Sequence, residues 1–201
     1  MANVPFPLSP SPFVPTPHAQ KLPLSFDAAR LQADLDVFEE EEWIAHFVRR
    51  NYDGSWSVIP LRGPAGETHP IRMSYSDPSC DAFEDTPFLD RTPYLREVLG
   101  AFECPLLSVR LMRLAPGSVI KEHTDFDLSI EDGTARLHVP IQTNPDVDFR
   151  LCGERMPLHA GECWYLKLSE PHSVRNDGSE PRVHLVLDVT VNSWLSELVS
   201  G

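Results

Sequence analysis

The fold class follows from residues 106–142, which read LLSVRLMRLAPGSVIKEHTDFDLSIEDGTARLHVPIQ. Segments 106–114 and 135–142 alternate apolar and polar residues, which is the two-residue period of a strand with one buried face. Pro116-Gly117 and Asp132-Gly133 are turn signals on either side of a third expected strand, at 119–126. Further strands are expected at 147–151, 162–168 and 182–191. Many short strands with closely spaced turns predict a β-sandwich or barrel in the second half of the chain.

The third of these strands carries a candidate metal site. His123 and Asp125 occupy alternate positions, so an extended backbone points both side chains to the same face. His172 supplies a second imidazole if the fold brings it to that face. Two histidines and one carboxylate form the facial triad of non-haem iron(II) oxygenases, which leaves coordination positions open. The alternative is a surface polar pair, because an H-x-D sequence alone recurs by chance.

Two similar segments, RLHV at 136–139 and RVHL at 182–185, predict a polar cavity inside the barrel. In each strand an arginine and a histidine share one face, while the aliphatic residues share the other face. The aliphatic face is expected to pack on helices and the polar face to line a cavity. A buried arginine is costly unless it meets an anion, so Arg136 and Arg182 suggest a bound carboxylate. Pairing with acidic residues of the same fold, or exposure at strand ends, is the alternative.

Composition narrows the class of protein. The chain has 201 residues, of which 41% are hydrophobic and 23% charged, as in ordinary soluble domains. Its net charge of −13 repels phosphate backbones, so nucleic acid and anionic membrane surfaces are not expected partners. No apolar run is long enough for a membrane helix, and the start lacks a secretory signal, so a cytoplasmic location is expected. The four cysteines form no C-x-x-C pair and are expected to be small buried residues.

Domain organisation follows from proline content and periodicity. Residues 1–24 are expected to form a proline-rich arm, because proline lacks an amide donor and disfavours helix and central strand. Residues 25–201 are expected to form a single domain. It comprises a helical part at 25–100, a β core at 101–191 and a C-terminal helix at 192–200.

Within the first part, Ser25 is expected to cap a helix at 26–38, and the apolar spacing at 43–47 predicts a second short helix. The later elements expected there are strands at 56–61 and 71–75, a loop at 76–87 and a helix at 93–99. Among the other histidines, His184 is expected to be an interior residue. His18, His46, His69 and His159 have no partners at ligand spacing and are expected at the surface.

Three motifs carry a resemblance to a known family: GECWYL at 161–166, PHSVRN at 171–176 and RVHLVLD at 182–188. Together with Pro116-Gly117 and the RLH segment, they resemble the aspartyl/asparaginyl β-hydroxylases, a branch of the iron(II)- and 2-oxoglutarate-dependent dioxygenases. The presence of Asp125 is similar to the bacterial, proline hydroxylase-like members. The resemblance covers about half of the chain, from 106 to 191.

The resemblance implies a mostly β fold with flanking helices, a double-stranded β-helix of the jelly-roll or cupin type. It implies iron ligands at His123, Asp125 and His172, with Arg182 on the distal carboxylate of 2-oxoglutarate and His138 beside this co-substrate. Arg136 resembles the position that grips a substrate carboxylate. One departure is Met112, where some members have a serine that binds the co-substrate.

The expected function is therefore hydroxylation of an unactivated carbon of an amino acid or a peptidyl residue, with iron(II), 2-oxoglutarate and dioxygen. One alternative is a cupin-type metalloenzyme that does not use 2-oxoglutarate, although such enzymes usually offer three or four histidines to the metal. The other is a non-enzymatic β-barrel that binds a partner through the proline-rich arm. The sequence does not identify the substrate.

Overall fold

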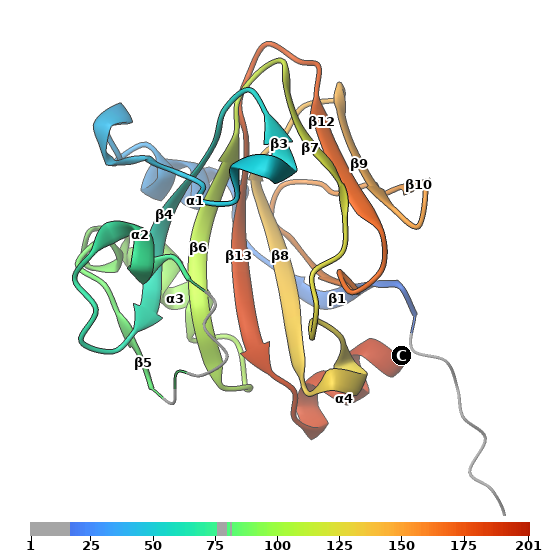
Figure 1. Ribbon diagram of the computed structural model, residues 1–201. Helices are drawn as coiled ribbons and strands as arrows, with labels where there is room; N and C mark the ends of the chain where they lie inside the picture. The colour runs from blue at the N-terminus through green and yellow to red at the C-terminus, as the bar shows by residue number, and fades with distance from the viewer. Residues whose placement is uncertain (1–16, 76–79, 81) are drawn as a thin grey trace, which may run out of the picture.

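The structure is a computed structural model that describes residues 17–75, 80 and 82–201. Two antiparallel sheets form its framework (Figure 1). The larger sheet has the strand order β1 (Ala19–Ser25), β11 (Glu162–Leu166), β8 (Thr134–Gln142), β13 (Arg182–Thr190), β6 (Leu106–Leu114), β4 (Trp56–Pro64) and β2 (Ile44–Ala45), with β5 (Phe83–Asp85) paired to β4. The smaller sheet has the order β10 (Glu154–Arg155), β9 (Val147–Leu151), β12 (His172–Asn176), β7 (Ser118–His123) and β3 (Tyr52–Asp53). This arrangement is the double-stranded β-helix that the resemblance implies.

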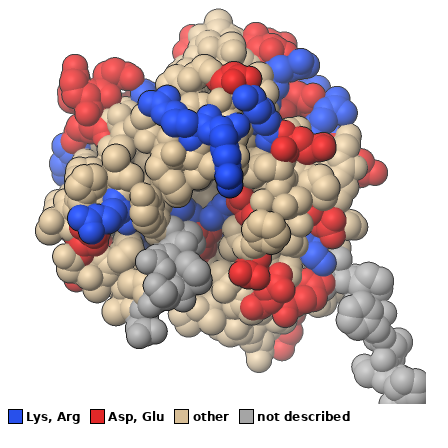
Figure 2. All heavy atoms as spheres, viewed as in Figure 1, with Lys and Arg blue, Asp and Glu red and all other residues tan. Residues whose placement is uncertain are grey.

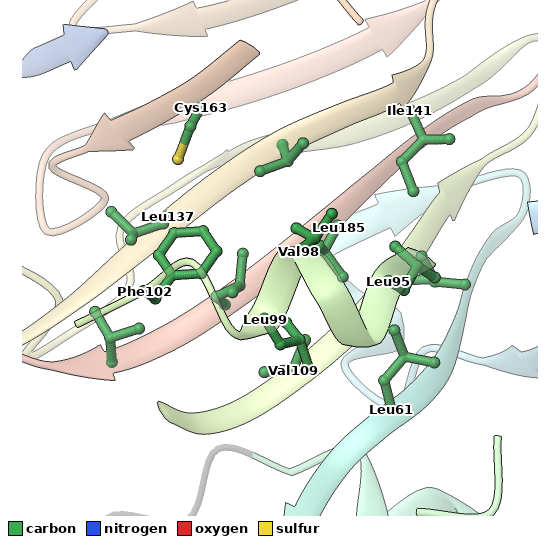
Figure 3. Packing of buried hydrophobic residues seen from close by; sticks show 14 of the residues in the cluster. Leu61, Leu95, Val98, Leu99, Phe102, Val109, Leu137, Ile141, Cys163 and Leu185 are labelled. Atoms are coloured by element: carbon green, nitrogen blue, oxygen red, sulfur yellow. The ribbon is translucent and has the colours of Figure 1, made fainter. Parts of the chain in front are cut away.

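The aliphatic face of the larger sheet packs on helices, as the alternation of its strands predicts. Three helices supply the other half of this core: α1 (Ala28–Leu35), α3 (Pro93–Leu99) and α4 (Ser193–Ser200). Figure 3 shows Leu95, Val98 and Leu99 of α3 directed at side chains of the strands. Leu137 and Leu185, which flank the expected cavity residues in sequence, are fully buried in this cluster.

A second apolar cluster lies between the two sheets. Met112 and Val186 of the larger sheet share this cluster with Ile120, Phe149 and Val174 of the smaller one. The expected cavity residues point to the same side, because successive strand residues face opposite ways. The site is therefore built between the sheets and not on the helix-covered face.

The start of the domain differs from the expectation. Residues 19–24, expected in the proline-rich arm, belong to strand β1, which pairs with β11 at the edge of the sheet. Ser25 is the last residue of that strand. Asp27 is the N-cap of the following helix, and its carboxylate accepts from the amides of Ala29 and Arg30. Residues 1–16 of the arm and residues 76–79 and 81 of the expected loop lie outside the described residues.

Two short elements were assigned to the wrong type. Residues 43–47 form no helix but contribute β2, and residues 71–75 form no strand but follow Pro70 into the short helix α2 (Pro70–Met73). Proline at the first helical position is the signal that favours a helix there. Because β2 to β5 also lie in the first half, residues 25–100 mix strands and helices and are not mainly helical.

Gly161 fixes the turn into β11, and we expect its replacement by alanine to destabilise the fold. Its φ is +82°, and a Cβ there would lie 2.3 Å from the carbonyl oxygen of Phe26. A left-handed conformation costs an L-residue about 1–2 kcal/mol, and the contact with backbone adds to this. Gly153 is a matched control, because its φ is +79° but nothing lies within 4 Å of a Cβ. Urea unfolding should show a clearly larger loss for Gly161→Ala than for Gly153→Ala, and equal losses would contradict the steric argument.

Charge is unevenly spread over the surface. Figure 2 shows Lys and Arg side chains gathered in the upper part of one face, with clusters of Asp and Glu around and below them. The electrostatic potential at the surface therefore differs from place to place, although the net charge of the chain is −13.

Within the described part of the chain, no helix has the length and apolarity to cross a bilayer.

Candidate active site

The two expected metal-binding histidines are direct neighbours across two strands. Strands β7 and β12 lie side by side and antiparallel (Figure 1). Their register places His123 opposite His172. The two imidazole ring centroids are 4.3 Å apart. Donor atoms of His123, Asp125 and His172 all lie within 4.8 Å of one another. The geometry thus brings together the three residues that the sequence singled out.

Backbone carbonyls set the orientation of both imidazoles. Nδ1 of His123 lies 2.7 Å from the carbonyl oxygen of Lys121, and Nδ1 of His172 lies 3.0 Å from that of Glu170. A carbonyl oxygen only accepts, so each Nδ1 carries the proton and each Nε2 keeps its lone pair for a metal. Burial lowers the pKa of His172, which favours the neutral form that a metal requires.

Asp125 lies two residues beyond His123, the last residue of β7, so the strand expected at 119–126 ends earlier than predicted. Its amide donates to the carbonyl oxygen of Leu168 at 2.8 Å, and this bond holds the carboxylate beside the histidines. One carboxylate oxygen, Oδ1, lies 3.6 Å from Nε2 of His123. The other, Oδ2, accepts from Nη1 of Arg136 at 2.6 Å. Asp125 therefore directs one carboxylate oxygen toward the two histidines and the other toward Arg136.

Arg136 is held by carboxylates of the fold itself, which is the alternative that the sequence left open. Its Nε and Nη2 donate to the two oxygens of Asp188 at 2.6 and 3.1 Å. Arg110, also buried, pairs with the same carboxylate and donates to the carbonyl oxygen of Ser74. Burial lowers the pKa of Arg136, but the charges of Asp188 and Asp125 outweigh burial and raise it. This network was missed from the sequence, although Arg110 and Asp188 each interrupt an apolar strand.

Arg182 is different, because no carboxylate of the described residues pairs with it. Its side chain is 2% exposed, and its Nε lies buried without a hydrogen-bond partner. The guanidinium carbon is 5.7 Å from the ring centroid of Phe149. Burial lowers the pKa of Arg182 to about 9, because no anion among the described residues compensates its charge.

His138 lies next to this arginine and is also incompletely satisfied. Its Nδ1 is 3.2 Å from Nδ1 of His184, so one ring donates to the other, and its Nε2 has no partner. Burial, followed by the charge of Arg182, holds the pKa of both histidines well below the ordinary value. His184 is thus the interior residue that was expected, and His138 offers a neutral nitrogen to the cavity.

These residues line one cavity between the sheets. Its wall is formed by Trp56, Met112, Ile120, His123, Asp125, Arg136, His138, Phe149, Leu168, His172, Val174 and Arg182. Met112 is 6% exposed and contributes an apolar surface, in agreement with the departure noted in the sequence. All six expected site residues therefore face a single space whose walls are otherwise apolar.

His46 is a buried neighbour of the site, not the surface residue that was expected. Its ring stacks on Trp56 with centroids 3.7 Å apart, and its Nδ1 accepts from the amide of Val48 at 3.3 Å. Burial, followed by the charges of Arg110 and Arg136, lowers its pKa to about 3. The sequence contains no sign of this burial, because it arises from aromatic contacts that form only in the folded state.

We expect His46 to make the protein less stable in acid. Between pH 6.5 and about 3, the unfolded chain binds a proton at His46 that the folded protein refuses, so stability falls as the pH drops. The slope for one such group is at most about 1.4 kcal/mol per pH unit. Urea unfolding near pH 7 and pH 5 should show a shallower dependence in His46→Gln than in the wild type. Equal dependences would show that His46 is not buried as a neutral group.

A double-stranded β-helix that holds two histidines and one carboxylate between its sheets is the arrangement of a class of metal-dependent proteins. Residues 26–191 match the family model described as aspartyl/asparaginyl β-hydroxylase. The chain belongs to this family, which confirms the resemblance seen in the sequence.

Two curated relatives are bacterial. The L-proline cis-4-hydroxylase of Rhizobium meliloti (strain 1021) is 29% identical over 177 residues, covering 85% of this chain and 60% of the relative. The L-proline cis-3-hydroxylase 1 of Streptomyces sp is 24% identical over 177 residues, covering 87% of this chain and 60% of the relative. The chain thus spans 60% of the length of these two relatives.

Solved structures share the fold at low sequence identity. An oxidoreductase of the 2OG-Fe(II) oxygenase family from Burkholderia pseudomallei has a TM-score of 0.53 and 17% identity, over 86% of this chain and 85% of that chain. A Pseudomonas putida prolyl-4-hydroxylase has a TM-score of 0.51 and 12% identity, over 88% of this chain and 94% of that chain. These similarities establish the architecture of the two sheets.

Proposed function

We propose that the protein is an iron(II)- and 2-oxoglutarate-dependent dioxygenase that hydroxylates an unactivated carbon of an amino acid or a peptidyl residue. The observation that carries this proposal is a buried Arg182 with no carboxylate partner among the described residues, in the same cavity as the His123, Asp125 and His172 cluster. Two imidazoles and one carboxylate suit iron(II) and leave positions open for other ligands. An arginine without a carboxylate of its own suits a dicarboxylic co-substrate.

Each residue has a separate task in this proposal. His123 and His172 offer their Nε2 atoms to the metal, because the carbonyls of Lys121 and Glu170 occupy Nδ1. Asp125 offers an oxygen while Arg136 holds the other one in place. When bound there, iron(II) would supply the oxidation of 2-oxoglutarate by dioxygen to succinate and carbon dioxide, coupled to C–H hydroxylation.

Arg182 and His138 would hold the co-substrate. The guanidinium pairs with the distal carboxylate, and this pairing relieves the cost of a buried charge. His138 provides the nearby Nε2, which is buried without a partner. The surrounding walls, including Met112 and Phe149, exclude water and strengthen these polar contacts.

Arg136 is the predicted contact for a substrate carboxylate. Of its five N–H groups, three donate to Asp188 and Asp125, so one N–H on Nη1 and one on Nη2 find no acceptor among the described residues. A substrate carboxylate at these groups would lie beside the metal. The printed names of the two bacterial relatives make L-proline the first substrate to test.

The test is turnover of the full chain with iron(II), 2-oxoglutarate and dioxygen, using L-proline, other L-amino acids and short peptides. The proposal predicts succinate formation that depends on one of these substrates, and a product that carries one oxygen atom from labelled dioxygen. A metal-dependent product formed without consumption of 2-oxoglutarate would contradict the proposal and favour the cupin-type alternative.

A further inference from the structure

A second group of metal-ligating side chains lies outside the candidate active site. Nδ1 or Nε2 of His18, Sγ of Cys152 and a carboxylate oxygen of Glu170 all lie within 4.8 Å of one another. His18 and Cys152 are separated by 134 positions along the chain, so the fold itself brings them together. None of the three lines the cavity between the sheets.

The backbone around these residues is tied together by hydrogen bonds. The carbonyl oxygen of His18, just before β1, accepts from the amide of Lys167 at 2.8 Å. The amide of Cys152, in the turn after β9, donates to the carbonyl oxygen of Pro171 at 2.8 Å. Three separate segments are thus held side by side, and each contributes one donor atom to the cluster.

The turn at Cys152 has an unusual backbone for its residue type. Its φ is +52°, a left-handed conformation that costs a non-glycine residue about 1–2 kcal/mol. Cys152 is exposed, so the expectation of a small buried cysteine is wrong at this position, while Cys104 and Cys163 are buried as expected. The thiol is therefore accessible from solvent beside an imidazole and a carboxylate.

The distance between two of the three donors fits a tetrahedral metal ion. Zinc bonds of about 2.3 Å to sulfur and about 2.0 Å to nitrogen place two such donors about 3.5 Å apart. Sγ of Cys152 lies 3.3 Å from Nδ1 of His18. An S–H···N hydrogen bond explains this pair alone, but it does not explain the third donor from Glu170. Burial and the carboxylates of Glu170 and Glu154 also raise the pKa of the Cys152 thiol, and a divalent cation would offset their charge.

We propose that His18, Cys152 and Glu170 form a second, solvent-accessible metal site for a zinc-like divalent ion, with water completing its coordination. Mixed nitrogen, sulfur and oxygen donors suit zinc better than the harder cations magnesium and calcium. The site would fasten the segment before β1 to the turn after β9.

Glu170 also connects this site to the candidate active site. Its carbonyl oxygen accepts from Nδ1 of His172, while its side chain belongs to the second cluster. An ion bound at the second site would therefore restrain the loop that orients one of the proposed iron ligands. The proposal for the second site does not depend on the reaction at the first.

Cobalt(II) titration of the full chain in an oxygen-free buffer tests the site directly. Thiolate bound to cobalt(II) gives a near-ultraviolet charge-transfer band, which the nitrogen and oxygen donors at His123 cannot produce. We expect the intensity of this band to reach its maximum when one cobalt ion per chain is bound to a thiolate. The band should disappear when zinc is added. Cys152→Ser should remove it, and His18→Ala should weaken cobalt binding at this site by more than about 10-fold.

Two variants serve as matched controls. Cys80→Ser removes the other cysteine that is not buried, and His159→Ala removes an exposed histidine outside the cluster. Both should retain the band at wild-type affinity. Absence of the band in the wild type, or its persistence in Cys152→Ser, would show that the cluster is only a hydrogen-bonded surface group.

Discussion

His172→Ala and, separately, His123→Ala should abolish iron(II) binding at the candidate active site and remove turnover. Each change deletes one of two imidazoles that face the same centre across β7 and β12. Removing residues that only support a ligand typically costs 10–100-fold in metal affinity or activity, so loss of a ligand should exceed about 100-fold. Anaerobic iron(II) binding followed by competition with a chelator, together with the succinate assay, measures both effects.

His159→Ala is the control for these variants, because its side chain is exposed and lies outside the candidate active site, beside Glu162. It should bind iron(II) and turn over like the wild type. Near-wild-type iron affinity in His172→Ala would contradict the ligand assignment, provided that its unfolding midpoint shows a folded protein.

The second large effect is expected at Arg182. Arg182→Met should raise the dissociation constant of 2-oxoglutarate by roughly 100- to 1000-fold, because a two-pronged, charge-assisted pair contributes about 3–4 kcal/mol. Iron(II) binding should be unchanged, since Arg182 is not part of the three-donor cluster. Arg182→Lys keeps a charge but loses the planar guanidinium. Its dissociation constant for 2-oxoglutarate should lie between those of the wild type and Arg182→Met.

The same variant should stabilise the protein without co-substrate. Arg182 is fully enclosed and has no carboxylate partner among the described residues, so methionine of similar size removes an uncompensated charge. Replacement of even a paired buried charge by apolar residues is often neutral or stabilising by about 1–4 kcal/mol, so removal of a charge without a carboxylate partner should fall on the stabilising side. Urea unfolding measures this gain. A variant that binds 2-oxoglutarate normally, or that loses stability, would show that Arg182 has another partner and another role.

The strand faces in the second half of the chain are predictable from sequence. In β8 and β13, every second residue is aliphatic and enters the helix-covered core. Arg136, His138 and Arg182 lie at the alternate positions and face the cavity. This succeeds because the two-residue period fixes which side chains share a face. The pairing of His123 with His172 needs the register of two strands 49 positions apart, which only the family resemblance suggested.

The charge network behind the site is not predictable in the same way. Arg110 and Asp188 interrupt apolar strands, which is a signal of buried charge, but their partners depend on strand register. In the fold Asp188 pairs with Arg136 across β13 and β8, and Arg110 on β6 completes the group. The sequence therefore could not decide whether Arg136 meets a ligand or a carboxylate of the chain.

Short elements in the first half were the least predictable. Apolar spacing over five residues fits both a helix and a strand, so residues 43–47 and 71–75 were assigned to the wrong type. The burial of His46 depends on stacking against Trp56, which arises only when β2 pairs with β4. Tertiary packing, not local propensity, decides these positions.

Anaerobic titration of the full chain with iron(II) and 2-oxoglutarate tests the central claim most directly. Simultaneous binding of both at one centre should produce a weak visible charge-transfer band, because the 2-oxo acid would bind at positions that His123, Asp125 and His172 leave open on iron(II). The band should be absent without either component and absent in His172→Ala. If iron(II) and 2-oxoglutarate bind without producing the band, or if the band survives in His172→Ala, the proposed dioxygenase centre is wrong.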